Sequence, residues 1–287
     1  MPAAPARGGG AAGANPSADR LIKVMATAPL PESLFAARTM QALELLALEP
    51  RSAPQVAEAL QVHPRTARRL LTRLADEGWL ARGAGPRRAY APTLRVVALA
   101  GPVLERCRIA QAARPVVEAL RDELGGTAHL MVPSHRWALC VLHAEEGRPA
   151  RPALRELAPA HATAAGKALL AQRAAWRESV LAAPLDRLTA RTLTDPSELR
   201  AALGAACRRG YVTEDGEWRP GRRAVAAPVF GTAGEVVAAL EASVPDGADF
   251  EIAGTRVAAA AREVSRRARP PPGHGGLPLH RGTAAGM

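Results

Sequence analysis

The sequence predicts an α+β protein with two folded units, and three observations support this prediction. A helix, a tight turn, a second helix and a short hairpin are expected between Ser52 and Tyr90. After Gly126, stretches that alternate apolar and polar residues like strands are mixed with helical patterns. Both ends of the chain are rich in Ala, Gly and Pro without periodicity, which is typical of disordered tails. The expected division is a tail (1–30), a first unit (31–95), a linker helix (96–109), a second unit (110–269) and a tail (270–287).

The first unit begins with two expected helices. Ser52 and Gln55 fit a capping box, so a short helix is predicted over Ala53–Leu60. The three residues Gln61–His63 then make a turn. An amphipathic helix over Leu34–Leu48 is expected to complete the core of this unit. Its apolar positions are Leu34, Ala37, Met40, Ala42, Leu43 and Leu46.

A basic helix follows the turn. It is expected to begin at Pro64 and to end near Glu77, because Gly78 is a residue type that commonly follows a helix terminus. Its apolar face consists of Ala67, Leu70, Leu71 and Leu74. A basic helix after a tight turn, with an arginine-bearing hairpin behind it, predicts a winged helix–turn–helix that binds the major groove of DNA. The predicted DNA contacts are Arg65, Thr66, Arg68, Arg69, Arg73, Arg87, Arg88 and Tyr90.

Composition restricts the possible partners and the compartment. The chain has 287 residues and a net charge of +11, which favours an anionic partner, either nucleic acid or an acidic membrane surface. No apolar run is long enough to cross a membrane, and the N-terminus lacks the apolar core of a signal peptide. Three widely spaced cysteines form no disulfide framework, so a cytoplasmic location is expected. Met25 is expected to be the true start of translation.

The second unit is expected to pair strands and to cover them with helices. Thr127–Val132 and Arg136–His143 should form a hairpin that turns at Pro133–His135. The other expected elements are helices over Ala110–Leu124, Thr163–Gln172, Asp195–Gly210 and Asp249–Arg269, with strands over Tyr211–Glu214, Ala224–Phe230 and Glu235–Ser243.

Metal-dependent and nucleophilic catalysis are not expected. Cys140 and His143 lie near His129 and His135, but strand alternation would place Cys140 and His143 on opposite faces. No nucleophile elbow, phosphate-binding loop or zinc-protease motif is present. No cofactor is therefore predicted. Two alternatives stay open: an enzyme that converts a small molecule in the second unit, and a protein that binds DNA without sequence preference.

Five ordered segments of the second unit carry a more specific signal. They are His161–Ala171 (HATAAGKALLA), Thr192–Pro196, Arg209–Tyr211, Asp215–Glu217 and Val225–Val229. With these segments in this order, the chain resembles the IclR family of bacterial transcription regulators over roughly residues 33–268. The resemblance implies a GAF-like effector-binding domain, a partly palindromic operator, a homodimer or a dimer of dimers, and repression rather than activation.

The resemblance also implies a ligand site. Backbone amides at the start of the helix that follows Thr163 would hold part of a small-molecule effector, and their positive dipole would suit an organic or aromatic acid. The implied effector-binding residues are Thr163, Ala164, Ala165, Gly166, Glu214, Asp215, Ala224, Glu241 and Ser243.

Three residues near this site leave alternatives open. Glu241 departs from the uncharged polar residues that the resemblance leads us to expect. If it faces a cavity, it would repel a carboxylate and favour a neutral or cationic ligand, whereas a solvent-facing side chain would have no such effect. Lys167 could bind an anion or point to solvent or to a carboxylate. His161 could contact the ligand or cap the signature helix.

Overall fold

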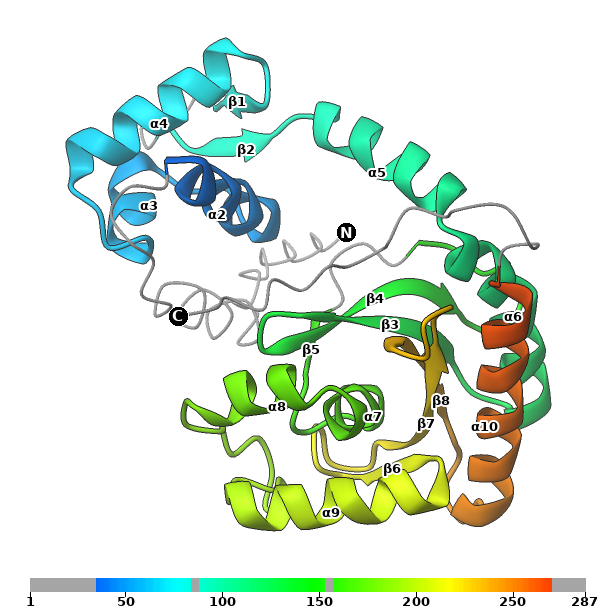
Figure 1. Ribbon diagram of the computed structural model, residues 1–287. Helices are drawn as coiled ribbons and strands as arrows, with labels where there is room; N and C mark the ends of the chain where they lie inside the picture. The colour runs from blue at the N-terminus through cyan, green and yellow to red at the C-terminus, as the bar shows by residue number, and fades with distance from the viewer. Residues whose placement is uncertain (1–34, 84–87, 153–156, 270–287) are drawn as a thin grey trace, which may run out of the picture. The chain divides into compact units, whose positions relative to one another are not determined.

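The computed structural model describes residues 35–83, 88–152 and 157–269 (Figure 1). Contacts between residues divide the chain into two units, between Pro102 and Val103. The two predicted tails lie outside the described residues, as do Leu34 and Arg87.

The first unit is a winged helix–turn–helix, and the predicted fold class is confirmed. Its elements are α2 (Phe35–Leu48), α3 (Ala53–Ala59), α4 (Pro64–Asp76), β1 (Leu80–Arg82) and β2 (Tyr90–Pro92). The Ser52 amide donates a hydrogen bond of 2.9 Å to the Gln55 side chain, so Gln55 satisfies one of the free amides at the start of α3. The turn before α4 is tight because Gln61 takes a left-handed conformation, with φ of 51°.

The core of the first unit forms where α2, α3 and α4 meet. It contains Ala42, Leu45, Leu46, Val56, Ala57, Ala67, Leu70, Leu71, Leu74, Leu80 and Tyr90. The prediction that Met40 packs in this core is wrong, because Met40 is 58% exposed whereas Leu45 is 2% exposed. The helical spacing of Ala42, Leu45 and Leu46 turns these three residues inward together.

Two helices follow the wing. Helix α5 (Arg95–Arg106) has no buried residue, and α6 (Arg108–Leu124) begins immediately after it. Cys107 separates them in an extended conformation, and its sulfur accepts a hydrogen bond from the Ala110 amide at 3.4 Å. Gly125 ends α6 in the left-handed conformation, with φ of 68°, which a glycine adopts without strain.

A six-stranded antiparallel sheet forms the centre of the second unit. Its strand order is β5-β4-β3-β8-β7-β6. The strands are β3 (Ala128–Ser134), β4 (Trp137–Ala144), β5 (Leu157–Pro159), β6 (Val212–Asp215), β7 (Arg223–Phe230) and β8 (Val236–Ser243). The remaining helices are α7 (Ala164–Gln172), α8 (Ala174–Leu181), α9 (Pro196–Arg209) and α10 (Phe250–Arg267).

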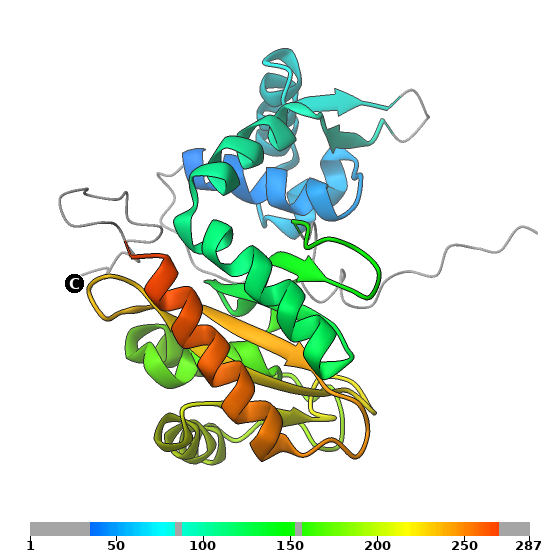
Figure 2. The ribbon, with the colours of Figure 1, turned by 90° about the vertical axis from the view of Figure 1, so that its right-hand side faces the viewer.

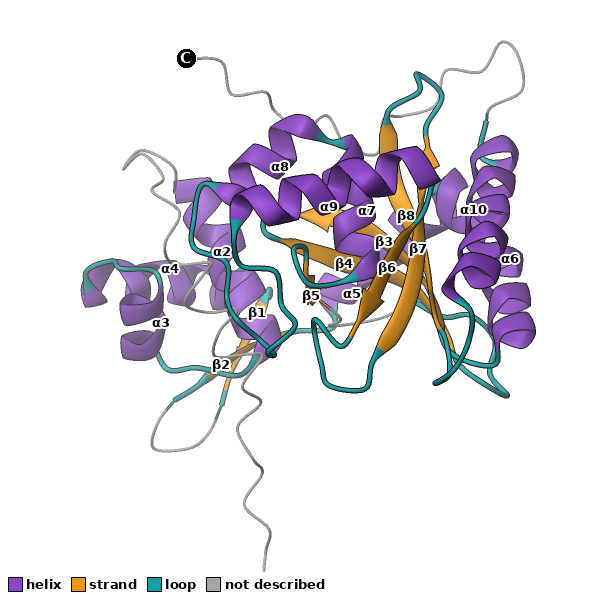
Figure 3. Cartoon of the chain, turned by 90° about the horizontal axis from the view of Figure 1, so that it is seen from below, coloured by secondary structure: helices purple, strands orange, loops and turns teal. Residues whose placement is uncertain are grey.

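Helices cover both faces of this sheet. Helices α6 and α10 run side by side over one face, where their apolar residues share a core with Leu130, Leu142 and Leu240 (Figure 2). Helices α7 and α9 lie on the opposite side (Figure 3). That second core is rich in alanine, and small side chains let α7 approach the strands closely. None of the described helices is long and apolar enough to cross a bilayer.

An irregularity in β4 changes which residues share a face. The pairing between β3 and β4 shifts between Leu130 and Met131, so that Met131 pairs with Cys140 and Leu130 pairs with Leu142. Cys140 therefore packs in the core beside α7, whereas Leu142 packs beside α6 and α10. Beyond the bulge, His143 returns to the face of Cys140, and the prediction that the two lie on opposite faces is wrong.

Gly166 allows α7 to pass directly against the preceding turn. A Cβ atom at this position would overlap the carbonyl oxygen and Cα of Ala160, which are backbone atoms and cannot rotate away. We expect Gly166→Ala to lower the free energy of unfolding of the chain by about 1–3 kcal/mol, the usual cost of overpacking. Urea denaturation followed by circular dichroism measures this change.

Gly204→Ala is the matched control, because Gly204 lies inside α9 and its nearest potential contact is an Arg208 side-chain nitrogen at 4.0 Å. Alanine is the better helix former there, so we expect a gain of roughly 0.5–1 kcal/mol. Equal effects of the two substitutions would contradict the close approach of α7.

Candidate functional site

Local sequence determines where α4 begins. His63 is the residue before the helix, and its ring nitrogen accepts a hydrogen bond from the Arg65 amide at 3.2 Å. Pro64 opens the helix, where its missing N–H costs nothing. The first turn of α4 therefore has a defined position relative to the turn that precedes it.

The two faces of α4 separate apolar from basic residues. Ala67, Leu70, Leu71 and Leu74 are buried, as the spacing predicted. Arg65, Arg68 and Arg69 are exposed, and Thr66 is half-buried. The guanidinium groups of these three arginines have no hydrogen bond or ion pair with any other residue that the structure describes. They are consequently available for an external anion.

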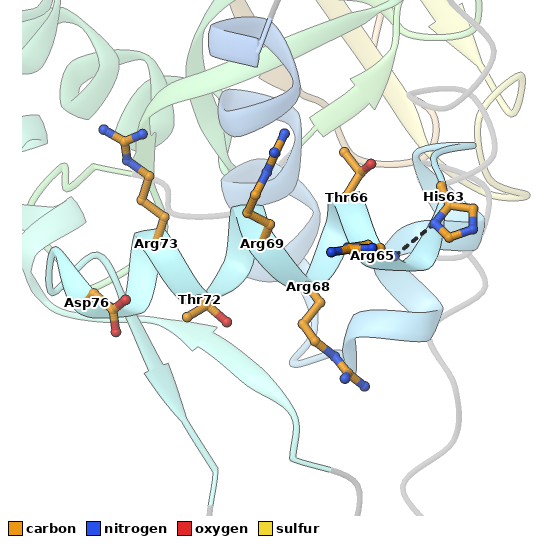
Figure 4. A pocket seen from close by; sticks show the side chains of 8 residues that line it. All are labelled: His63, Arg65, Thr66, Arg68, Arg69, Thr72, Arg73 and Asp76. Carbon is orange, nitrogen blue, oxygen red and sulfur yellow. Dashed lines mark hydrogen bonds between the residues drawn. The ribbon is translucent and has the colours of Figure 1, made fainter.

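A hollow on the surface of α4 brings these groups together (Figure 4). Its lining consists of His63, Arg65, Thr66, Arg68, Arg69, Thr72, Arg73 and Asp76. Arg69 and Arg73 leave the helix on one side and Arg68 on the other, so the basic groups spread across the width of the helix (Figure 4). Arg73 differs from its neighbours because its Nε lies 3.1 Å from Glu77.

The predicted wing residues differ in exposure. Arg88 is exposed and has a left-handed backbone, with φ of 39°. Tyr90 is only 5% exposed and belongs to the core of the first unit, so we leave it out of the proposed DNA contacts. Arg82, which the sequence analysis did not select, lies over the Tyr90 ring at 5.3 Å from its centre. Arg82 is exposed at the end of β1, and its guanidinium lies 3.4 Å from the Thr72 hydroxyl of α4.

The second candidate site lies around the start of α7. Thr163 caps this helix by accepting a hydrogen bond from the Gly166 amide at 3.2 Å. His161 does not cap it, because its Nε2 lies 2.9 Å from the carbonyl oxygen of Asp186. Lys167 is 4% exposed and points to a carboxylate, since its Nζ lies 2.5 Å from Glu217.

Glu241 does not face solvent, which was one of the two orientations that the sequence left open. It is 3% exposed, and its carboxylate accepts a hydrogen bond of 2.7 Å from the Ala165 amide in the first turn of α7. It therefore faces the interior. The guanidinium of Arg222 lies 2.5 Å from the other carboxylate oxygen. Arg222 also pairs with Glu214, which is completely buried, so one arginine joins two carboxylates.

Burial and the charge of Arg222 act in opposite directions on the pKa values of Glu241 and Glu214. Burial would raise the pKa of Glu241, but Arg222, His129 and the Ala165 amide together outweigh burial and lower that pKa. At Glu214 burial prevails, and the pKa is raised despite the same guanidinium. The pKa values of the two carboxyl groups that share Arg222 therefore shift in opposite directions.

Arg222 is the residue of this cluster that sequence reasoning missed. It follows Gly221 and precedes β7, in a loop whose placement against β8 no local pattern reveals. A signal was nevertheless present: Glu214 lies on the short strand β6 and Glu241 on β8, whose other residues are mostly apolar, and a buried carboxylate requires a cation. Burial of these two glutamates would have directed attention to the arginine between them.

The remaining predicted effector residues divide into two groups. Ala164, Ala165, Gly166 and Ala224 are buried in the core beside α7, together with Thr163. Asp215 points away from them, with its side chain half exposed and 2.9 Å from Arg191. Ser243 is engaged elsewhere, because its hydroxyl accepts a hydrogen bond of 2.7 Å from the Thr127 amide. The structure therefore brings Glu214 and Glu241 together, but not Asp215.

His129, His143 and Glu241 lie in a row across three neighbouring strands. His129 pairs across the sheet with both His143 and Glu241, and the two imidazole rings are 4.9 Å apart. Within the described ranges, no group of three or more His, Cys, Asp or Glu residues has the arrangement of a metal site.

Comparison with known proteins relates both units to one family. A family model described as "Bacterial transcriptional regulator IclR C-terminal" matches residues 101–267. The HTH-type transcriptional regulator BhcR of Paracoccus denitrificans (strain Pd 1222) is 30% identical over 239 residues, which cover 79% of this chain and 85% of that protein.

Two solved structures have a similar fold. An IclR transcriptional regulator from Alicyclobacillus acidocaldarius matches with a TM-score of 0.68 and 25% identity, over 81% of this chain and 98% of its own. An IclR homolog from Microbacterium hydrocarbonoxydans, crystallised with 4-hydroxybenzoate, matches with a TM-score of 0.64 and 26% identity, over 80% of this chain and 96% of its own. With a family model that spans most of the second unit and a relative that spans both units, the chain belongs to the IclR family of bacterial transcription regulators.

Proposed function

We propose that this regulator reads an operator in double-stranded DNA through the first turns of α4 and responds to a small organic metabolite through the second unit. The observation that carries the proposal is the exposed row of Arg65, Arg68 and Arg69, whose guanidinium groups have no partner among the described residues. Unpaired arginines at a helix start fit phosphate oxygens and guanine edges. A cytoplasmic location follows from this role, because operator DNA lies in the cytoplasm.

We propose a homodimer as the functional form, and pairing of two dimers into a tetramer. Helix α5 supports this proposal. Val97, Leu99 and Val103 on this helix, and Leu94 just before it, are between 52% and 85% exposed in the single chain. Apolar side chains this exposed favour burial against another surface, and a second copy of α5 supplies one with the same character.

The proposed mechanism is a shift between conformations. A ligand that binds one arrangement of the dimer more tightly than another changes the spacing of the two α4 helices, and hence the affinity for two half-sites. A coupling free energy of about 1–3 kcal/mol changes operator affinity roughly 5- to 150-fold.

The arginines of α4 provide the first test. DNA that the wild-type protein selects from a random-sequence pool serves as the operator in a mobility-shift assay. We expect a variant carrying Arg65→Ala, Arg68→Ala and Arg69→Ala to bind it at least about 100-fold more weakly, because each lost base contact costs about 1–3 kcal/mol. The dependence of binding on salt should also become less steep.

The matched control removes the same charge elsewhere. Arg148, Arg256 and Arg266 have side chains that are 63–68% exposed and lie in the second unit. The triple alanine variant at these positions should bind the operator nearly as well as wild type. Equal losses in the two triple variants, or equal wild-type affinity for random DNA at fixed salt, would instead indicate binding without sequence preference.

Helix α5 provides the second test. We expect Leu99→Glu combined with Val103→Glu to convert the dimer to a monomer, because two charges would enter an apolar contact. Light scattering coupled to gel filtration measures the mass. Ile252→Glu is the control, since Ile252 is 63% exposed on α10. A monomeric Ile252→Glu protein beside a dimeric α5 variant would move the proposed interface to α10.

A further inference from the structure

The start of α7 already holds a carboxylate that belongs to the chain. The first amides of a helix lack backbone partners and attract anions. One of them, the Ala165 amide, donates to Glu241 at 2.7 Å, and the Gly166 amide donates to the Thr163 hydroxyl. Glu241 reaches this position from β8, 76 residues later in the chain. The tertiary fold, rather than local sequence, therefore places the Glu241 carboxylate on the Ala165 amide.

The charges around Glu241 disfavour a further anion. Three carboxylates, those of Glu214, Glu217 and Glu241, share two cations, Arg222 and Lys167. Both of these cations are therefore already paired with carboxylates of the chain, and the ring of His129 lies 3.8 Å from Glu241 as well. Another carboxylate brought to this place would be buried against like charge without a free cation, which is strongly unfavourable.

Two buried polar atoms of this region still lack a hydrogen-bond partner, and their chemistry indicates which ligand groups could bind them. Oε2 of Glu217 and Nδ1 of His143 are buried and have no hydrogen-bond partner among the residues that the structure describes. A carboxylate oxygen accepts hydrogen bonds and does not donate them when ionised. The unsatisfied capacity at Glu217 therefore calls for a donor, such as a hydroxyl, an amide N–H or an amine.

We propose that Glu241 determines effector specificity in this regulator: it occupies the Ala165 amide at the start of α7 as a built-in carboxylate, excludes carboxylate effectors and selects a neutral or cationic hydrogen-bond donor. The inference rests on the proposed function, since it assigns the chemical class of that effector. It differs from the organic or aromatic acid that the sequence motifs imply. Arg222 is a positioning residue in this arrangement, because it holds Glu241 without being free to bind a second anion.

The test removes the internal carboxylate from the full-length chain. Glu241→Ala frees the Ala165 amide and one side of Arg222, and propionate has the same heavy atoms as a glutamate side chain. We expect propionate to raise the melting temperature of this variant in a saturable manner, whereas sodium chloride and propionamide at equal concentration do not. The wild-type protein should show no saturable response. Its affinity for propionate should be at least about tenfold weaker than that of the variant.

A matched control separates position from charge. Glu214→Gln removes one negative charge from the same Arg222 but leaves Glu241 on the α7 amide. We expect this variant to behave as wild type toward propionate. Equal propionate binding by Glu214→Gln and Glu241→Ala would overturn the assignment to Glu241, as would a folded Glu241→Ala protein without a propionate response. If Glu241→Ala does not fold, Glu241→Ser provides the same space with a smaller apolar change, and the same outcomes apply.

The wild-type protein supplies an independent measurement. Calorimetric titration with 4-hydroxybenzoate should give no saturable heat, and compounds that release the operator should be neutral or cationic. A carboxylate that binds wild type or releases its operator would overturn the proposal. Loss of operator recognition altogether would contradict the proposed function instead, because the propionate assay contains no DNA.

Discussion

The close approach of α7 to the sheet is the constraint on which the second unit depends. Gly166 lies against the Ala160 backbone where no larger residue fits, and alanines fill the interface with the strands. A helix held this near brings its first amides within hydrogen-bonding distance of β8. The helix dipole and the strand residue then form one electrostatic unit, and Glu241 can be buried because the amides and Arg222 compensate its charge.

This arrangement has an energetic cost and a chemical consequence. Buried ion pairs contribute little net stability, because desolvation offsets their attraction. The cluster of Glu214, Arg222 and Glu241 is therefore better understood as a device for selectivity than for stability. An interior in which Arg222 and Lys167 are already paired with carboxylates of the chain has no free arginine or lysine for a further anion.

In the first unit, different side chains of one helix pack the core and face outward. In α4 the leucines provide the packing that holds the helix, and the arginines between them face outward. Because helical spacing separates the two sets, packing and binding do not compete for the same side chains. Arg73 is the exception, since its ion pair with Glu77 must loosen before it can bind a phosphate.

The sequence by itself determined the elements that depend on local patterns. Helix–turn–helix spacing, capping residues and the signature HATAAGKALLA predicted the fold, the family and the outward face of α4. Tertiary structure decided what long-range pairing controls. The bulge in β4 placed His143 beside Cys140, burial took Tyr90 into the core, and strand order joined Arg222 to Glu241. Local patterns report periodicity and caps, whereas the orientation of a charged side chain depends on neighbours that only folding brings together.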